Sequence, residues 1–152
     1  MALIQPVNLT KIDENSFEYR YVSCIILTHD NKILLQKRGR NWSKFPGMIS
    51  TFGGRIEENE KPKEALIREL NEELGAQVDM NNIIELGAYT EAITEHTELI
   101  YGFFWHDRYK TITGCYEGEP IYYDNPNNIP AAPISMDDVL WLVNECKNRH
   151  LF

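Results

Sequence analysis

Three glutamates in one short stretch of this chain have the spacing to bind a divalent cation. Glu72 and Glu73 follow Glu69 by three and four residues, so at ~100° per residue the three lie within an arc of roughly 100° on one side of a helix. Each pair of like charges at these spacings destabilises a helix by roughly 0.2 to 0.5 kcal/mol. A hard cation bound between the carboxylates would make the same pairs stabilising. Carboxylate oxygens suit Mg²⁺ or Mn²⁺, and Mg²⁺ usually shares its coordination with substrate phosphates. The cluster therefore predicts a metal site that handles a phosphate compound.

The helix that would carry these acids is expected over about residues 62–74. Its apolar residues form a separate stripe that can pack on a core; they are Leu66, Ile67, Leu70 and Leu74. Pro62 would lie in the first turn, where its missing N–H costs nothing. Gly75 would end the helix as a left-handed cap. The acidic side of the helix is then left over for another purpose.

Two glycine-containing pairs precede this helix and bracket a short expected strand, residues 48–52. Pro46-Gly47 and Gly53-Gly54 predict tight turns where backbone can approach a metal or a phosphate closely. We therefore expect the segment before the helix to meet the acidic side of the helix at one place.

Residues 54–76 also resemble a known pattern, the signature box of the Nudix hydrolases. That box reads glycine, five residues, glutamate, seven residues, then Arg-Glu-apolar-any-Glu-Glu-any-Gly-apolar, and every fixed position is filled here. Ala76 is a mild departure, because the family usually carries a larger aliphatic residue there. A solvated acidic helix face explains most acidic runs, but a match at so many fixed positions favours the box.

The resemblance implies roles for individual residues of this chain. It implies that the carbonyl of Gly53 and the carboxylates of Glu69, Glu72 and Glu73 bind the metal, and that Arg68 orients a catalytic carboxylate. The expected cofactor is Mg²⁺, with Mn²⁺ possible. We favour Glu69 as the general base or the metal ligand on the side of the base.

The implied reaction is hydrolysis of a phosphoanhydride bond in a nucleoside diphosphate linked to another group. Metal ions would neutralise developing charge and lower the pKa of a bound water, while positioning and electrostatics supply most of the rate. Nucleoside triphosphates or damaged nucleotides are slightly favoured as substrates, followed by nucleotide sugars and then dinucleoside polyphosphates. Arg68 is expected to pair with Glu60 and to contact the metal-binding carboxylates without touching the metal itself.

A second acidic segment follows later in the chain, where Glu117 and Glu119 flank Gly118. Many members of the family place an extra metal-binding or catalytic glutamate in a loop after the second hairpin. We favour Glu119, because residues 121–123 after it are expected to form a strand that would fix its position; Glu117 is then a substrate-binding candidate. A solvated acidic loop is the competing interpretation.

Positive residues near the box are candidates for binding the substrate phosphates. Arg55 directly follows the glycines and is the better candidate, whereas Arg38 belongs to a basic loop, residues 38–47, that could equally be solvated. Aromatic residues could stack a base. Tyr101, Phe103 and Trp105, however, alternate along one face of an expected strand, which favours a place in the core.

The remaining elements predict an α+β protein. Residues 19–28 and 32–37 suggest one β-hairpin, and residues 83–93 and 98–106 suggest a second. A capping-box-like start at Ser135 precedes an apolar pattern of helical period, which predicts a C-terminal helix over roughly residues 136–148. The family resemblance sharpens this order to an α/β/α sandwich with a mixed β-sheet.

Length and composition indicate one domain and a small-molecule partner. The 152 residues, of which 43% are hydrophobic, fit a single domain over residues 1–152. The net charge of −8 argues against nucleic-acid binding. Three cysteines without C-x-x-C spacing suggest reduced thiols in a cytoplasmic protein, and no segment predicts a signal peptide or membrane span. The sequence leaves monomer and homodimer open.

Two other function classes remain possible on this sequence. A catalytically silent module of the same fold that senses nucleotides usually shows eroded glutamates, and none is eroded here. An isomerase acting on a prenyl diphosphate would need a reactive cysteine in the site. Cys24, on the first expected strand, shows no sign of activation.

Overall fold

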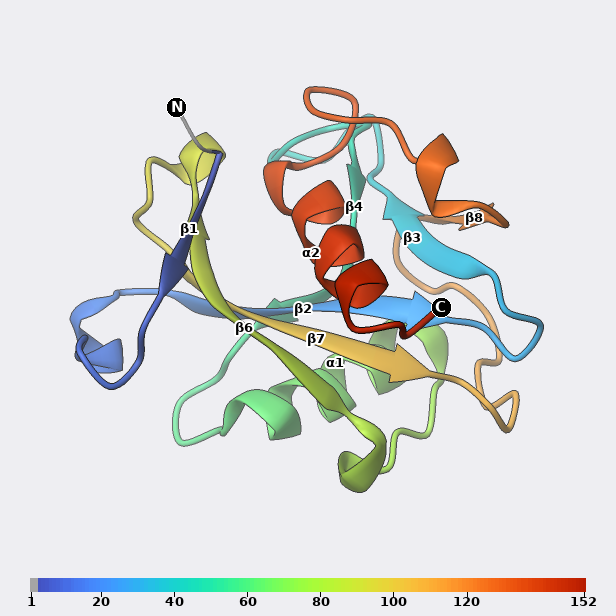
Figure 1. The fold of residues 1–152 in the computed structure, drawn as a ribbon, viewed down its shortest axis with the longest axis horizontal. Helices are drawn as coiled ribbons and strands as arrows, with labels where there is room; N and C mark the ends of the chain where they lie inside the picture. Colours follow the sequence, from blue (N-terminus) through green and yellow to red (C-terminus); the bar gives the residue numbers. More distant parts are fainter. Residues whose placement is uncertain (1–2) are drawn as a thin grey trace.

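A computed structural model describes residues 3–152, which form a mixed β-sheet with one long helix on each face (Figure 1). The strands are β1 (Ile4–Val7), β2 (Arg20–Leu27), β3 (Ile33–Lys37), β4 (Ile49–Ser50), β5 (Phe52–Arg55), β6 (Ile84–Glu91), β7 (Leu99–His106) and β8 (Glu119–Tyr123). The helices are α1 (Pro62–Leu74) and α2 (Asp137–Asn148), with 3₁₀ turns η1 (Glu14–Ser16), η2 (Met80–Asn82), η3 (Ala92–Thr94) and η4 (Pro126–Asn128). The expected α/β/α sandwich is confirmed.

The sheet is organised around β2 and β7, which run parallel to each other at its centre. The strand order is β1-β6-β7-β2-β3-β4, while β5 pairs with β2 and β8 pairs with β3. All the pairs other than β2–β7 are antiparallel. The last six residues of β2 are all buried, because helices cover both faces of a central strand.

The core is divided by the sheet into two apolar layers. One layer packs α1 against the sheet and contains Tyr101, Phe103 and Trp105 of β7. The other packs α2 against the opposite face and contains Ile100 and Phe104 of the same strand. The expectation that the alternating aromatic residues of β7 belong to the core is therefore confirmed.

Helix α1 has the bounds that its sequence predicts. Pro62 occupies its first turn, and the Lys61 N–H donates to Glu64 Oε1 at 2.8 Å. Gly75 ends the helix with φ at 66°, in the left-handed region that glycine adopts without cost. Among residues 3–152, no helix combines the length and the hydropathy needed to cross a membrane.

Several local predictions were wrong in ways that affect the site. Gly53 and Gly54 lie inside strand β5, paired with β2, rather than in a tight turn. Helix α2 begins at Asp137 without a side-chain cap, and the buried Oγ of Ser135 has no hydrogen-bond partner. Strand β1 was not expected from the sequence. The first hairpin exists, but only its turn-proximal residues pair, Ile26 with Leu34 and Leu27 with Ile33, since the rest of β2 pairs with β5 and β7.

Candidate active site

Strand β5 holds its glycine pair directly against the acidic side of α1. The Gly53 N–H donates to Glu73 Oε1 at 3.0 Å. A Cβ on Gly54 would lie 2.4 Å from the carboxyl carbon of Glu69, so only glycine leaves room for that carboxylate. The segment before the helix and the acidic side of the helix therefore meet at one place, as the sequence predicts.

Glu73 is buried, which corrects the expectation that the whole acidic side of α1 is left over from packing. Its side chain is only 1% exposed, and Gln36 Nε2 lies 3.4 Å from Glu73 Oε2. Burial raises the pKa of Glu73 to about 9, and the nearby carboxylates Glu117 and Glu69 act in the same direction. Glu72, by contrast, has a side chain that is 58% exposed. The three glutamates thus lie in very different environments.

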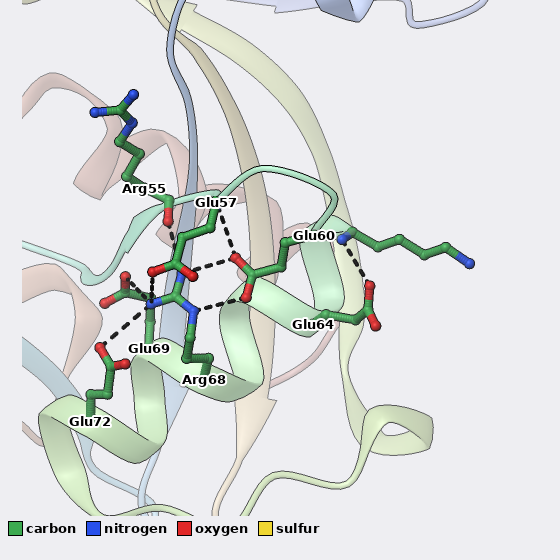
Figure 2. Close-up of polar contacts among 8 residues, drawn as sticks. Arg55, Glu57, Glu60, Glu64, Arg68, Glu69 and Glu72 are labelled. Carbon is green, nitrogen blue, oxygen red and sulfur yellow. Dashed lines mark hydrogen bonds and ion pairs between the residues drawn. The ribbon is translucent and has the colours of Figure 1, made fainter.

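Arg68 lies at the centre of a group of carboxylates, as Figure 2 shows. Its Nε and one Nη contact the two oxygens of Glu60 at 2.8 and 2.9 Å, so the expected Arg68–Glu60 pair is confirmed. The same guanidinium donates to Glu69 Oε1 at 2.9 Å and to the carbonyl of Arg55 at 2.9 Å. The hydrogen bonds to Glu60 are the main reason that the pKa of Arg68 is raised. Arg68 therefore connects the helix, the preceding loop and strand β5, and fixes Glu69.

The carboxylate oxygens of this group are of the ligand type that divalent cations bind. Within residues 3–152, no three acidic, histidine or cysteine side chains converge as a ready metal site, because Glu73 turns toward Gly53 while Glu69 turns toward Arg68. Burial raises the pKa of Glu69, and the contact with Arg68 opposes that rise. Crowded carboxylate oxygens beside a glycine backbone are ligands that Mg²⁺ and Mn²⁺ prefer. The ligand roles of Glu69, Glu72 and Glu73 remain predictions.

A cavity of about 370 Å³ opens on the other side of the glycine pair. Gly53 and Gly54 form part of its wall, together with Gln36, Arg38 and Glu117. A cavity of this size lies within the usual range for small-molecule sites. The acids of α1 lie immediately behind the glycines, so a ligand in the cavity would lie next to them.

The two loop acids are placed differently by the turn at Gly118, where φ is +69°. Glu117 lines the cavity, and its carbonyl accepts a hydrogen bond from Gln36 Nε2 at 2.9 Å. Glu119 is the first residue of β8, where it pairs with Lys37, and it does not line the cavity as far as residues 3–152 define it. The geometry thus favours Glu117 over Glu119, the reverse of the preference drawn from the sequence.

The structure also reverses the preference between Arg55 and Arg38 as the residue that binds a substrate phosphate. Arg38 lines the cavity and stacks over Trp42, with 4.7 Å from Cζ to the ring centroid. The side chain of Arg55 points away from the acidic group in Figure 2 and lies over the ring of Tyr19 at 4.3 Å. Only the backbone carbonyl of Arg55 takes part in the site, through Arg68. Arg38 is therefore the better placed cation for a phosphate in the cavity.

Sequence reasoning missed Gln36, which contacts both Glu73 and Glu117. The available signal was a lone amide directly after the apolar residues 33–35 of this strand, where a buried polar group needs partners. It also missed Glu91 and Asp138, which line the same cavity. Neither residue belongs to a motif.

Comparisons with known proteins agree on one family. The NUDIX domain profile matches residues 18–131. The nucleoside triphosphatase NudI of Salmonella paratyphi B is 33% identical over 93 residues, which cover 56% of this chain and 66% of that relative. The match thus spans slightly less than two thirds of the relative.

Solved structures share the fold. A MutT/nudix family protein from Enterococcus faecalis superposes with a TM-score of 0.70 at 14% identity, over 88% of this chain and 62% of the other. A bifunctional NMN adenylyltransferase/ADP ribose pyrophosphatase from Francisella tularensis, complexed with AMP and a Mn ion, gives a TM-score of 0.62 at 15% identity, over 86% of this chain and 41% of the other.

Proposed function

This chain belongs to the NUDIX family, and we propose that it is a pyrophosphohydrolase acting on a nucleoside diphosphate linked to another group. The observation that carries the proposal is the glycine pair of β5, which lines the cavity on one side and contacts Glu69 and Glu73 on the other. Nucleoside triphosphates are the first substrate class to test, which the name of the NudI relative supports. Damaged nucleotides stand with them, and nucleotide sugars follow.

We propose Mg²⁺, or Mn²⁺ in its place, as the cofactor. The Gly53 carbonyl and the carboxylates of Glu69, Glu72 and Glu73 would hold it. A bound divalent ion neutralises charge on phosphate oxygens and lowers the pKa of a water molecule. The Mn ion in the Francisella tularensis neighbour supports this class of ion.

The residues of the chain itself would position the substrate and accept the proton. Glu69 is the proposed general base, and Arg68 holds its carboxylate in place through a 2.9 Å contact. Arg38 and Lys44 line the cavity and would bind phosphate oxygens, for which a planar guanidinium is well suited. Glu117 is the proposed loop acid, placed to interact with the same ion or water.

The experiment that tests the proposal is a product assay on the purified protein. It would be incubated with Mg²⁺ and a panel of nucleoside triphosphates, nucleotide sugars and dinucleoside polyphosphates, followed by detection of phosphate, pyrophosphate and nucleoside monophosphate. Turnover that disappears in EDTA is the expected result. Tight binding of a nucleotide without turnover anywhere in the panel would instead indicate the sensing module.

The isomerase alternative is disfavoured by the position of Cys24. This residue is fully buried, and burial raises the pKa of its thiol well above the ordinary value, so a reactive thiolate is not available. Cys24, Cys115 and Cys146 are all unpaired, which supports the proposal of a reducing, cytoplasmic environment. We propose small nucleotides as the partners, with the chain acting as a monomer or homodimer.

Replacing Glu117 and Glu119 one at a time should show which of them is the loop acid that takes part in the reaction. Glu117→Gln is expected to slow turnover by roughly 10²-fold, because Glu117 lines the cavity as the proposed loop acid. Glu119→Gln, the matched control two residues away, should change turnover less than about threefold. Steady-state kinetics with saturating Mg²⁺ checks this. A larger loss in the Glu119 variant would restore the assignment made from the sequence.

A further inference from the structure

The basic loop, residues 38–47, lies between β3 and β4 (Figure 1) and is closed on itself by backbone hydrogen bonds. The carbonyl of Gly39 accepts one hydrogen bond from the N–H of Trp42 at 3.2 Å and another from the N–H of Gly47 at 3.3 Å. One carbonyl near the start of the loop thus binds both its middle and its end. The side chains of the loop therefore have a defined frame on which to rest.

Three groups of this loop contact the guanidinium of Arg38. Its Nε donates to the carbonyl of Lys44 at 3.1 Å. Its Cζ lies 4.7 Å from the centroid of the Trp42 ring and 5.9 Å from that of Phe45, and aromatic rings within about 6 Å attract a cation. The loop therefore holds the guanidinium by one edge and against two rings.

The other edge of the same guanidinium is open. The bond from Nε is the one hydrogen bond that the Arg38 side chain makes within residues 3–152, so both Nη groups lack a protein partner there. Arg38 lines the cavity beside the glycine pair. Two Nη groups in one plane form a fork that matches two oxygens of a phosphate. The open edge is thus the part of Arg38 that suits a substrate.

The electrostatic surroundings place this fork close to the acids of the candidate active site. Burial lowers the pKa of Arg38, while the negative charges of Glu117 and Glu73 act in the opposite direction. No carboxylate nevertheless forms an ion pair with Arg38 in the part of the chain that the structure describes. An arginine side chain stays charged in a protein, so a partly desolvated cation lies near the acids without being neutralised by one of them.

Gly39 leaves the space that the indole of Trp42 occupies. A Cβ at Gly39 would lie 2.4 Å from Nε1 and 2.6 Å from Cδ1 of Trp42. The backbone of Gly39 is not in the left-handed region, so its conformation alone does not require glycine. Any side chain at this position would therefore push the indole away from its place beside Arg38.

We propose that Trp42 is a positioning residue for substrate binding, whose indole holds the guanidinium of Arg38 so that its two Nη groups receive a phosphate of the substrate. This inference rests on the proposed function, since it concerns the same cavity. Trp42 does not line that cavity as far as residues 3–152 define it, so it acts through Arg38. Because the loop orders the guanidinium in advance, less side-chain entropy is lost when the phosphate binds.

The position of Arg38 can be tested by NMR without any ligand. The side-chain Nε–H resonance of Arg38, identified by its absence in Arg38→Lys, should carry a ring-current shift from Trp42. Trp42→Leu should lose this shift, and Gly39→Ala should reduce it because the indole is displaced. An unchanged Arg38 resonance in Trp42→Leu would overturn the proposal.

The consequence for phosphate binding is tested with inorganic pyrophosphate in EDTA, followed by NMR titration. Trp42→Leu should weaken binding about fivefold, the usual size of one cation–π contact at a partly exposed site. Trp42→Phe keeps an aromatic ring and should stay within about twofold of the wild type. If Trp42 only filled space in the loop, leucine and phenylalanine would serve equally well, and equal binding by these two variants would contradict the proposal.

Two further variants serve as a second test and a control. Gly39→Ala keeps every charged and aromatic group but should weaken pyrophosphate binding as Trp42→Leu does. Tyr109→Leu removes an aromatic side chain that is 82% exposed and outside the cavity, and it should bind as the wild type does. Failure of the wild type to bind pyrophosphate would also overturn the proposal, since the fork of Arg38 would then not be an oxyanion site.

Steady-state kinetics separates this inference from the proposed function. With any substrate that the product assay identifies, Trp42→Leu should raise KM about fivefold and leave kcat within about twofold, because a contact made before the reaction affects bound substrate and transition state alike. Absence of turnover together with the expected differences in pyrophosphate binding would reject only the proposed function. Turnover in the wild type with an unchanged KM in Trp42→Leu would reject only this inference.

Discussion

Glu73→Gln is expected to reduce Mg²⁺-dependent turnover by about a thousandfold while leaving the protein folded. Charge stabilisation by a bound ion is worth several kcal/mol, and about 4 kcal/mol corresponds to a factor of roughly 10³. The amide oxygen of the introduced glutamine can still accept the hydrogen bond that the Gly53 N–H donates to Glu73 at 3.0 Å. The variant thus loses a ligand charge but keeps the contact that fixes β5 to α1.

Loss of metal affinity can be measured without turnover. A ligand that binds only the folded state raises stability in proportion to the logarithm of its concentration, so Mn²⁺ should raise the melting temperature of the wild type. The same titration should have little effect on Glu73→Gln. Glu58→Gln, which removes an exposed acid from the loop before α1, is the control and should match the wild type. An undiminished Mn²⁺ response in Glu73→Gln would show that this carboxylate does not bind the ion.

Much of the candidate site around α1 can be predicted from the sequence, because its parts are close together in the chain. Helix α1 has its own start, its own apolar stripe and its own glycine end, so local rules fix its bounds. The pair Arg68–Glu60 spans only eight residues. The burial of Glu73 was not predictable in this way, since it depends on β5 and on Gln36 of β3.

The walls of the cavity depend on contacts between distant parts of the chain. Glu91 and Asp138 are brought together because β6 and α2 pack on each other, and Tyr89 reaches Asp138 across 49 positions. No spacing rule links such residues. The choice between Glu117 and Glu119 likewise depends on a left-handed glycine and on the register of β8 with β3, which a single sequence does not reveal.

Replacing the two glycines of β5 by alanine should have contrasting effects: the change at Gly53 should reduce stability, and the change at Gly54 should reduce turnover. At Gly53, φ is +149° and a Cβ would lie 2.0 Å from the carbonyl oxygen of Val22. Backbone in the middle of a sheet cannot move aside, so Gly53→Ala should destabilise the fold by on the order of 3 kcal/mol or more. Urea unfolding measures this, and a variant too unstable to purify gives the same answer.

Gly54→Ala should instead preserve the fold and impair the chemistry. Its backbone is not in the left-handed region, and the atoms that a Cβ would meet belong to the carboxyl end of Glu69, which can rotate away. We therefore expect a stability change within about 1 kcal/mol, with turnover lowered roughly 10²-fold because a displacement of about 1 Å in a catalytic group has that effect. Wild-type turnover in Gly54→Ala would mean that the position of Glu69 against β5 does not matter for catalysis. Since the two glycines are adjacent in one strand, the contrast between their variants would separate the structural role of β5 from its role in positioning the carboxylate of Glu69.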